Sequence, residues 1–460
     1  MKNLIALFCI LFISSYSFSQ TTVTQVANFS DQNFVKITQL DNGEYLTFSH
    51  GITIAEPNGI NVFSIDPTNN NTTHISECAQ VNYPAKHLFA NSVHMFNNDV
   101  GVVVMSQNYS GYGPTGIFKT YDGGQTWTRK YSLPVDSGLD RITDMLFFNE
   151  NYGVALGSFY TESILLQTTD GGETWTSIQN FPTYHLQALS KTGSSSFIVI
   201  ANTFVNYEPT TWKVISFENY GATYDEISSI ASSTKEVKKI QMLNSAVGYV
   251  SLFTWDSLEY DYIYRTIDGG ATWQEMANFS DVMVERMKIQ KLYFFNEQDG
   301  FVLAGDYCDE NSCYRGGSLL KTTDGGQSWN VEHKIAPSNH NFWDMSLDNS
   351  LGEGYIVGGN ITNGEGTIHK VEFDPVVSIQ NLEKKDYITL FPNPSSETIT
   401  MRFDNILQKG ALQIFNTQGQ LILTDDISKT IRKNYSFQNG TYIYRFISQD
   451  TFDIGTFIIH

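Results

Sequence analysis

Three features of the sequence predict an all-β fold made of repeated units. An eight-residue turn, Thr-x-Asp-Gly-Gly-x-Thr/Ser-Trp, occurs at 120–127, 168–175, 266–273 and 322–329, with a degenerate copy at 217–224. The copies are separated by about 50 residues and flanked by short apolar segments. Aromatic residues make up 14% of the chain, and no long segment has the period of an amphipathic helix. This combination is typical of a β-propeller, in which each repeat forms one blade.

Residues 1–20 predict a secretory signal peptide. Lys2 precedes an apolar segment at 4–13, and small polar residues follow, which is the order found in cleavable export signals. No later run of 18 apolar residues occurs, so the sequence predicts no transmembrane helix. We therefore expect an exported protein.

A second repeated pattern predicts seven blades between residues 21 and 374. Pairs of strands joined by a polar turn are expected at 34–48, 93–104, 144–156, 185–199, 240–251, 291–303 and 342–357. A third strand follows each pair. Five of these third strands end in the Asp-containing turn, whereas those at 60–66 and 367–373 do not.

The last blade lacks a fourth strand of its own. Residues 22–30 resemble residues 272–280, which form the end of the turn at 266–273 and the segment after it, so the mature chain begins with an outermost blade strand. We expect the strand at 23–29 to complete the last blade and close the ring, because closure removes an exposed sheet edge.

We interpret the Asp-containing turns as structural. Glycine reaches positive φ at low cost, the Asp carboxylate can accept backbone N–H groups, and the Trp ring can bury a large area. A metal or catalytic role for the aligned carboxylates is the alternative, although a catalytic site needs only one copy. The structural set comprises Asp122, Trp127, Asp170, Trp175, Asn219, Asp268, Trp273, Asp324 and Trp329.

These turns resemble the Asp-box, or BNR, repeat of sialidase-type and sortilin-type propellers. In that family the boxes lie at the blade periphery, so the resemblance implies a structural role. The Phe-Phe-Asn-Glu-x-x-Gly segments at 147–153 and 294–300, with the box spacing, also resemble the photosystem II stability and assembly factor-like repeats. That second resemblance implies protein binding.

Residues 387–460 differ from the propeller in composition and follow a short linker at 375–386. This segment has six basic and six acidic residues, so the net charge of −20 belongs to the rest of the chain. We expect a small β-sandwich with strands at 388–390, 398–403, 411–416, 420–424, 440–448 and 451–459.

This tail resembles the type A C-terminal sorting domain of the type IX secretion system. The resemblance rests on 390–394, 412–416 with Gly419-Gln420, and 439–445. It departs from the family at Arg445, where Lys is common, and at 457–460, which lack the usual basic residues. The resemblance implies export through the periplasm and recognition of residues 387–460 by the secretion machinery. It implies a secreted or outer-surface protein whose tail is either cleaved or used as an anchor.

Charge and cysteine content limit the other partners. A net charge of −20 opposes nucleic-acid binding and favours solubility, cations or basic partners. Cys308 and Cys313 flank a short loop and are expected to form a disulfide in an exported protein. We expect a monomer with no cofactor and no metal. A calcium site at Asp306, Asp309, Glu310 and Asn311 is an alternative, but the spacing fits no EF-hand loop.

The loops between second and third strands are the candidate ligand-binding elements. They are rich in aromatic and acidic residues, and such loops meet at one end of a propeller axis. Aromatic faces stack on sugar rings, so we expect a glycan or a protein ligand; the alternative is unrelated loops with incidental aromatic residues. The candidate residues are Tyr109, Tyr112, Tyr160, Tyr207, Trp255, Asp256 and Tyr307.

A glycoside hydrolase is the alternative function, because Asp-box propellers include sialidases and other hydrolases. Sialidases need an arginine triad, whereas residues 21–374 hold five Arg and no Phe/Tyr-Arg-Ile-Pro motif near their start. Other hydrolases use two facing carboxylates, and the sequence shows no such pair among the rim carboxylates. We therefore predict a binding module without catalytic residues.

Overall fold

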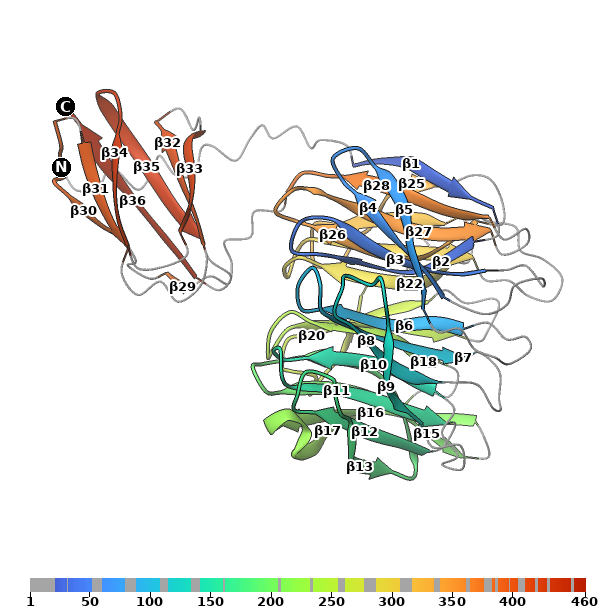
Figure 1. The fold of residues 1–460 in the computed structure, drawn as a ribbon. Helices are drawn as coiled ribbons and strands as arrows, with labels where there is room; N and C mark the ends of the chain where they lie inside the picture. The colour runs from blue at the N-terminus through green and yellow to red at the C-terminus, as the bar shows by residue number, and fades with distance from the viewer. Residues whose placement is uncertain are drawn as a thin grey trace. The chain divides into compact units, whose positions relative to one another are not determined.

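The fold consists almost entirely of antiparallel strands (Figure 1). Its contacts divide the chain into two units, Met1–Val376 and Val377–His460. One 3-10 turn, η1 (Asn219–Gly221), interrupts the strands of the first unit. The structure is a computed structural model, and it describes residues 21–30, 32–51, 60–78, 88–107, 115–133, 141–159, 162–205, 208–231, 235–254, 261–276, 287–306, 317–334, 340–360, 365–375, 383–384, 388–396, 398–403, 410–417, 421–427, 431–447 and 451–460.

In the described part of the first unit, seven sheets have four strands each. Six of them use four consecutive strands, so each sheet folds from one continuous repeat. The first three are β2 (Gln32–Gln39), β3 (Tyr45–Gly51), β4 (Ile60–Asp66) and β5 (Asn71–Cys78); β6 (Leu88–Met95), β7 (Gly101–Gln107), β8 (Gly116–Thr120) and β9 (Thr128–Ser132); and β10 (Arg141–Phe147), β11 (Gly153–Phe159), β12 (Glu162–Thr168) and β13 (Thr176–Phe181). The next three are β14 (Tyr184–Lys191), β15 (Phe197–Val205), β16 (Glu208–Glu218) and β17 (Thr223–Ala231); β18 (Lys235–Met242), β19 (Gly248–Thr254), β20 (Tyr262–Thr266) and β21 (Gln274–Glu275); and β22 (Met287–Phe294), β23 (Gly300–Asp306), β24 (Ser318–Thr322) and β25 (Asn330–Lys334).

The seventh sheet joins the two ends of the first unit. It contains β26 (His340–Asp348), β27 (Glu353–Asn360) and β28 (Gly366–Glu372), and its fourth strand is β1 (Thr22–Phe29). β1 runs antiparallel to β28, from Thr22 opposite Glu372 to Phe29 opposite Gly366. In Figure 1 the blue β1 accordingly lies beside the orange β28.

The first and seventh sheets also contact each other directly. Trp343 Nε1 donates to Asn33 Oδ1 at 3.1 Å. The ring centroids of Tyr45 and Tyr355 lie 4.8 Å apart. Successive sheets elsewhere pack in the same face-to-face way; one apolar cluster, for example, combines Phe48 of β3 with Met105 of β7. Such burial contributes roughly 25 cal/mol per Å² of apolar surface, so the sheet-to-sheet cores supply most of the stability.

Every first strand contains a register shift at the same place, shortly before its middle. A β-bulge bends a strand and re-aims the side chains that follow it. The residues that resume the ladder after the seven bulges are Lys36, Ser92, Asp144, Ala188, Lys239, Lys291 and Asp344.

The described residues of the second unit form a five-stranded and a three-stranded sheet. The larger has the order β29 (Glu383–Lys384), β36 (Thr451–Ile459), β35 (Gly440–Ile447), β32 (Gly410–Asn416) and β33 (Leu421–Ile427). The smaller has the order β30 (Ile388–Phe391), β31 (Thr398–Phe403) and β34 (Ile431–Ser436). Ile399, Met401 and Phe403 of the smaller sheet pack against Leu412, Phe446 and Phe457 of the larger one.

Two strands of this unit were not expected from the sequence. β34 has the sequence Ile-Arg-Lys-Asn-Tyr-Ser, in which two of six residues are apolar, so its pattern of alternation is weak. It is fixed by pairing with β31, from Thr398 opposite Ser436 to Phe403 opposite Ile431. β29 lies in the segment expected to be a linker and pairs with β36 over two residues.

Candidate functional site

The residues expected to bind a ligand lie outside the described part of the chain. This applies to Tyr109, Tyr112, Tyr160, Tyr207, Trp255, Asp256 and Tyr307, and also to the cysteines Cys308 and Cys313. Each of the seven falls between the second and third strands of its sheet. In an antiparallel four-stranded sheet, these connections leave from the end at which the first strand begins.

The four complete boxes have one hydrogen-bond pattern, contained within each turn. In the first, Asp122 Oδ1 accepts from Thr120 Oγ1 at 2.9 Å and from the Thr126 N–H at 2.8 Å. Asp122 Oδ2 accepts from Thr126 Oγ1 at 2.6 Å. The same bonds recur at Asp170, Asp268 and Asp324. No box carboxylate reaches another through these bonds.

The box glycines and tryptophans complete the turn. Both glycines of each complete box have positive φ, for example 68° at Gly123 and 89° at Gly124. The degenerate box keeps positive φ at both glycine positions, with 60° at Tyr220 and 97° at Gly221, and Asn219 at the Asp position also has a positive φ of 51°. Trp175 and Trp329 are buried, whereas Trp127 and Trp273 are half-buried and donate Nε1–H to the carbonyl of Gly124 and Gly270, both at 3.0 Å.

The residues after the seven bulges form the candidate site, which we call the axial ring. Its members come from equivalent positions of the seven first strands, and five are charged: Lys36, Asp144, Lys239, Lys291 and Asp344. Four of these influence the titration of Lys36, so charges from five different sheets lie close together.

Asp344 is the most strongly engaged member of the axial ring. Its carboxylate lies 2.8 Å from Lys291 Nζ and 3.7 Å from Lys36 Nζ, and it accepts the Ile37 N–H at 3.2 Å. Burial alone would raise the pKa of Asp344, but the two lysines and the Ile37 N–H lower it below its usual value. Asp344 is therefore an ionised carboxylate that joins the first, sixth and seventh sheets.

The lysines of the axial ring outnumber its carboxylates by three to two. Burial, together with the nearby Lys239 and Lys291, lowers the pKa of Lys36 to about 8 against the opposing effect of Asp344. Lys291 keeps a raised pKa, because its contact with Asp344 outweighs burial. A site of this kind favours an anionic group of a ligand over a cation.

A second buried ion pair lies between neighbouring sheets. Lys288 Nζ of β22 lies 3.3 Å from Asp261 Oδ1, and the other oxygen, Oδ2, accepts the Ile289 N–H at 2.8 Å. Asp261 comes directly before β20, at the end of the fifth sheet where the second-to-third connection returns. This pair fixes the fifth sheet against the sixth.

The sequence reasoning missed the axial ring. Alignment of the seven first-strand repeats placed these residues at equivalent positions. However, the charged residues follow a bulge, which shifts the alternation of inward- and outward-facing side chains by one residue. Without the bulge, these charges look like ordinary solvent-facing residues. Within the described residues, no group of three or more His, Cys, Asp or Glu side chains is arranged to hold a metal ion.

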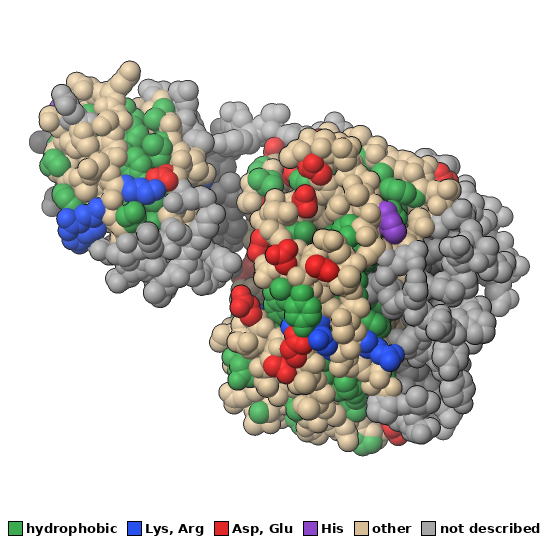
Figure 2. Space-filling view, viewed as in Figure 1, with side chains coloured by type: hydrophobic (Ala, Val, Ile, Leu, Met, Phe, Trp, Pro, Cys, Tyr) green, Lys and Arg blue, Asp and Glu red, His purple; other side chains and the backbone are tan. Residues whose placement is uncertain are grey.

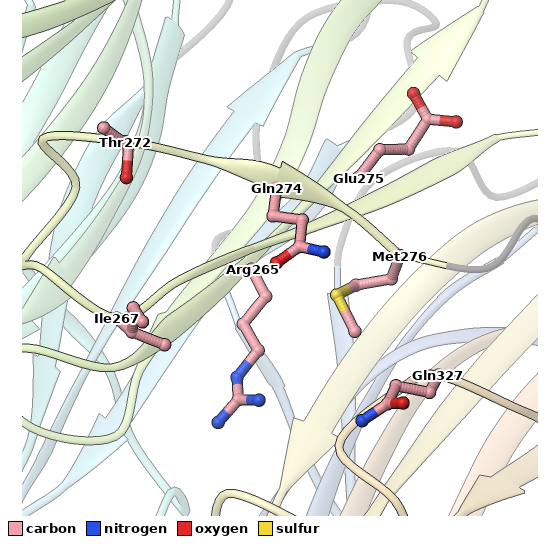
Figure 3. A pocket seen from close by; sticks show the side chains of 7 residues that line it. All are labelled: Arg265, Ile267, Thr272, Gln274, Glu275, Met276 and Gln327. Carbon is pink, nitrogen blue, oxygen red and sulfur yellow. The ribbon is translucent and has the colours of Figure 1, made fainter.

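A groove of about 510 Å³ lies between the box hairpin of the fifth sheet and the box turn of the sixth (Figure 3). Arg265, Gln274 and Met276 point into it from the fifth sheet, and Gln327 faces them from the sixth. Ile267, which is 68% exposed, and Thr272 line the other side. The groove therefore combines one cation, one carboxylate residue (Glu275), two amides and an apolar rim.

Acidic side chains are scattered over the face of the first unit that Figure 2 shows, and fewer basic side chains lie among them. Among the described residues, no helix is long and apolar enough to cross a membrane.

Comparisons with solved structures identify the fold of the first unit. The structure entitled "YCF48 bound to D1 peptide" matches 78% of this chain and 99% of its own, with a TM-score of 0.52 at 15% identity. YCF48 from Cyanidioschyzon merolae gives a TM-score of 0.50 at 13% identity, again with 78% and 99% coverage. A polysaccharide lyase of family PL25, an ulvan lyase, gives 0.53 at 9% identity and covers 75% of this chain and 95% of its own.

The sequence comparisons identify the tail. A search of curated proteins finds no match. Residues 389–460 match the family described as secretion system C-terminal sorting domain. The chain therefore combines a β-propeller with a type IX sorting domain, which directs the protein to the cell surface or exterior.

Proposed function

We propose that this protein is a secreted binding module whose ligand is a glycan or a surface protein. The observation that carries the proposal is the axial ring. Charged side chains from five sheets meet there, and its two carboxylates are not both free to act as a catalytic pair. Asp344 is shared by two lysines and a backbone N–H. Such a ring can orient an anionic group of a ligand.

The proposed module is a seven-bladed propeller over residues 21–374, closed by β1, with a linker at 375–386 and a sorting domain at 387–460. Seven four-stranded sheets and the pairing of β1 with β28 support this arrangement. The contacts of Trp343 with Asn33 and of Gln39 with Asp348, at 3.1 and 2.8 Å, support closure between the first and last blades. We further propose a cleaved signal peptide at 1–20 and a Cys308–Cys313 disulfide.

We propose that the Asp boxes serve the scaffold. Each carboxylate binds donors of its own turn, and the repeated bonds at Asp122, Asp170, Asp268 and Asp324 support that role. Hydrogen bonds from Thr174 and Thr168 outweigh partial burial and lower the pKa of Asp170 to about 2. A carboxylate engaged in this way has little capacity left for substrate.

The ligand would contact the loops between second and third strands, at Tyr109, Tyr112, Tyr160, Tyr207, Trp255, Asp256 and Tyr307. These loops extend from the strand ends that surround one end of the axis, and the axial ring lies farther along the same axis. Stacking of aromatic rings on sugars or on side chains would provide affinity, and the lysine excess would select an anionic group.

The proposal is tested by capturing glycans and outer-surface proteins on the mature chain. Changing Trp255→Ala and Tyr112→Ala together should weaken capture while leaving the midpoint of urea unfolding nearly unchanged. Tyr224→Ala is a matched control, because Tyr224 is an exposed aromatic residue of an outermost strand. Equal capture by the double variant and the control would reject the loop site.

A polysaccharide-degrading enzyme, such as a glycoside hydrolase using rim carboxylates, is the competing function. The likeness to a polysaccharide lyase propeller concerns the fold and leaves this possibility to experiment. The lowered pKa of Asp344 argues against its use as a general acid. Incubation of the mature chain with fluorogenic sialosides, a β-glucan panel and uronate-containing polysaccharides separates the two functions, since turnover would favour the enzyme.

A further inference from the structure

Two interfaces between neighbouring sheets place a cation against a box turn. In each sheet, the third-strand residue equivalent to Lys119, which directly precedes the first box residue where a box is present, faces the box of the next sheet. For the five boxes, including the degenerate one, these facing residues are Ser64, Lys119, Gln167, Ser216 and Arg265. Only Lys119 and Arg265 are cations, so the two interfaces can be compared position by position.

At the interface of the second and third sheets, an internal carboxylate fills the space beside the cation. Glu173, three residues after Asp170, lies 2.6 Å from Lys119 Nζ and 2.8 Å from Lys130 Nζ, and it accepts the Tyr121 hydroxyl. Partial burial would raise the pKa of Glu173, but these three donors lower it to about 2. We call this arrangement the filled cradle.

At the interface of the fifth and sixth sheets, the cation remains but the box carboxylate is absent. Gln327 stands where the filled cradle has Glu173, Ile267 replaces Tyr121, and Met276 replaces Lys130. The cation keeps its place: an ideal Cβ on Gly325 would lie 3.4 Å from Arg265 Nη1, and one on Gly171 would lie 3.6 Å from Lys119 Nζ. The groove in Figure 3 is therefore an unfilled counterpart of the filled cradle.

Arg265 has donors to spare. Its guanidinium carries five N–H groups, and Nη2, which holds two of them, donates to Glu297 at 3.2 Å. Nε has no hydrogen-bond partner among the described residues. The carboxylate of Glu275 accepts from the Tyr264 hydroxyl at 2.8 Å and points away from Arg265 in Figure 3. Glu297 is thus the carboxylate paired with Arg265 in the described structure.

We propose that this groove binds a glutamate or aspartate side chain of a partner protein, with Arg265 as its anchor. The partner's carboxylate would take the place that Glu173 occupies in the filled cradle. Gln274 and Gln327 can hydrogen-bond the partner's backbone, and Ile267 and Met276 supply an apolar rim. Arginine suits this role because its planar fork can hold a carboxylate through two parallel hydrogen bonds. The site lies beside the boxes and is independent of the loop site proposed above.

The test uses the mature chain and N-acetyl-glutamate methylamide as the probe. Binding is followed through the ¹⁵N–¹H signal of Arg265 Nε, assigned by its loss in Arg265→Gln, and through saturation-transfer signals of the probe. We expect the glutamate probe to shift this signal saturably, whereas the neutral glutamine analogue should not. Probe affinity should fall about 10- to 100-fold in Arg265→Gln, the range expected for loss of a charge-assisted hydrogen bond.

Gln327→Glu is the sharpest variant, because it should rebuild the filled cradle. The new carboxylate should pair with Arg265, abolish probe binding and leave the unfolding midpoint unchanged or raised. Gln125→Glu is its matched control: it adds the same charge at the equivalent position of another box, which faces Ser64 rather than a cation. Probe binding should persist in this control.

Glu173→Gln provides the reverse experiment, because it should empty the filled cradle. We expect a second probe site and a lower unfolding midpoint in this variant. Probe binding that survives Gln327→Glu would overturn the proposal, as would the absence of any shift in the unmodified chain. Saturable binding of glucuronate without binding of the glutamate probe would also overturn it, since the ligand would then be an acidic sugar.

Discussion

Asp344 is the residue whose removal should most damage the first unit. Changing Asp344→Asn keeps the shape of the side chain but leaves the ammonium groups of Lys291 and Lys36 without their shared carboxylate. Breaking a buried ion pair by neutralising one partner costs about 3–5 kcal/mol, because the remaining charge stays buried. The amide oxygen of Asn can still accept the Ile37 N–H, so we add no further penalty for that bond. We expect a loss of about 3–5 kcal/mol in the free energy of unfolding at pH 7.

The measurement is urea unfolding of the mature chain, followed by tryptophan fluorescence. Asp41→Asn is the matched control, because Asp41 is an exposed aspartate in the turn that follows the first strand of the first sheet. Removing Asp344 lowers the pKa of Lys36 below the value of about 8 that it has in the unmodified chain, so Lys36 of the variant loses its proton first. The loss in Asp344→Asn should therefore shrink as pH rises toward 8. A loss of less than about 1 kcal/mol, the range of exposed ion pairs, would refute the view that Asp344 joins three sheets.

Three further predictions concern the same unit. Lys36 has a pKa of about 8 in the folded chain and about 10.4 in the unfolded chain, so the unfolded chain binds more protons between these two values. The free energy of unfolding should therefore rise with pH across this window. Lys36→Gln should remove that rise when urea unfolding is measured at each pH. Trp329→Ala should lower the free energy of unfolding by about 3–5 kcal/mol and more than Trp273→Ala, because Trp329 is 3% exposed and Trp273 is half-buried; similar losses would count against this ranking. The pKa of Asp170 is depressed, so its hydrogen bonds stabilise the fold above about pH 4 and are lost as pH falls toward 2. Asp170→Asn should therefore weaken the dependence of stability on pH in this range, measured by circular dichroism during acid unfolding.

The repeated parts of the fold could be predicted from the sequence because they are repeated. The box turns and the first-strand pairs occur in several copies, so a pattern that is weak in one copy becomes clear when copies are aligned. The four-stranded sheets and the pairing of β1 with β28 follow from such alignment. β34 could not be found in this way, because it occurs once and its six residues include only two apolar ones.

The axial ring escaped the sequence analysis for a different reason. Its charged residues lie at equivalent positions, but they have different identities in each sheet, and the bulge before them breaks the alternation that marks inward-facing positions. The ionic contacts of Lys36, Lys291 and Asp344 join residues as far as 308 positions apart in the chain. No local pattern reports a contact over that separation, and only the packing of the first, sixth and seventh sheets against one another brings the three together.

The same contrast tells where function should be sought in a repeat protein of this kind. Residues that recur in most copies, such as the box aspartates, satisfy hydrogen bonds that each complete box must satisfy. Residues that vary between copies are free of that requirement. The sixth box position is such a residue: it is Gln125, Glu173, Ala222, Ala271 and Gln327 in turn, and Gln327 leaves the cation of its interface without a box carboxylate. The scaffold tolerates it because Arg265 retains Glu297 as a partner, and the remaining donors of Arg265 become available to a ligand. Variable positions that leave a neighbouring cation with unused hydrogen-bond donors are therefore better candidates for ligand binding than the repeated Asp box itself.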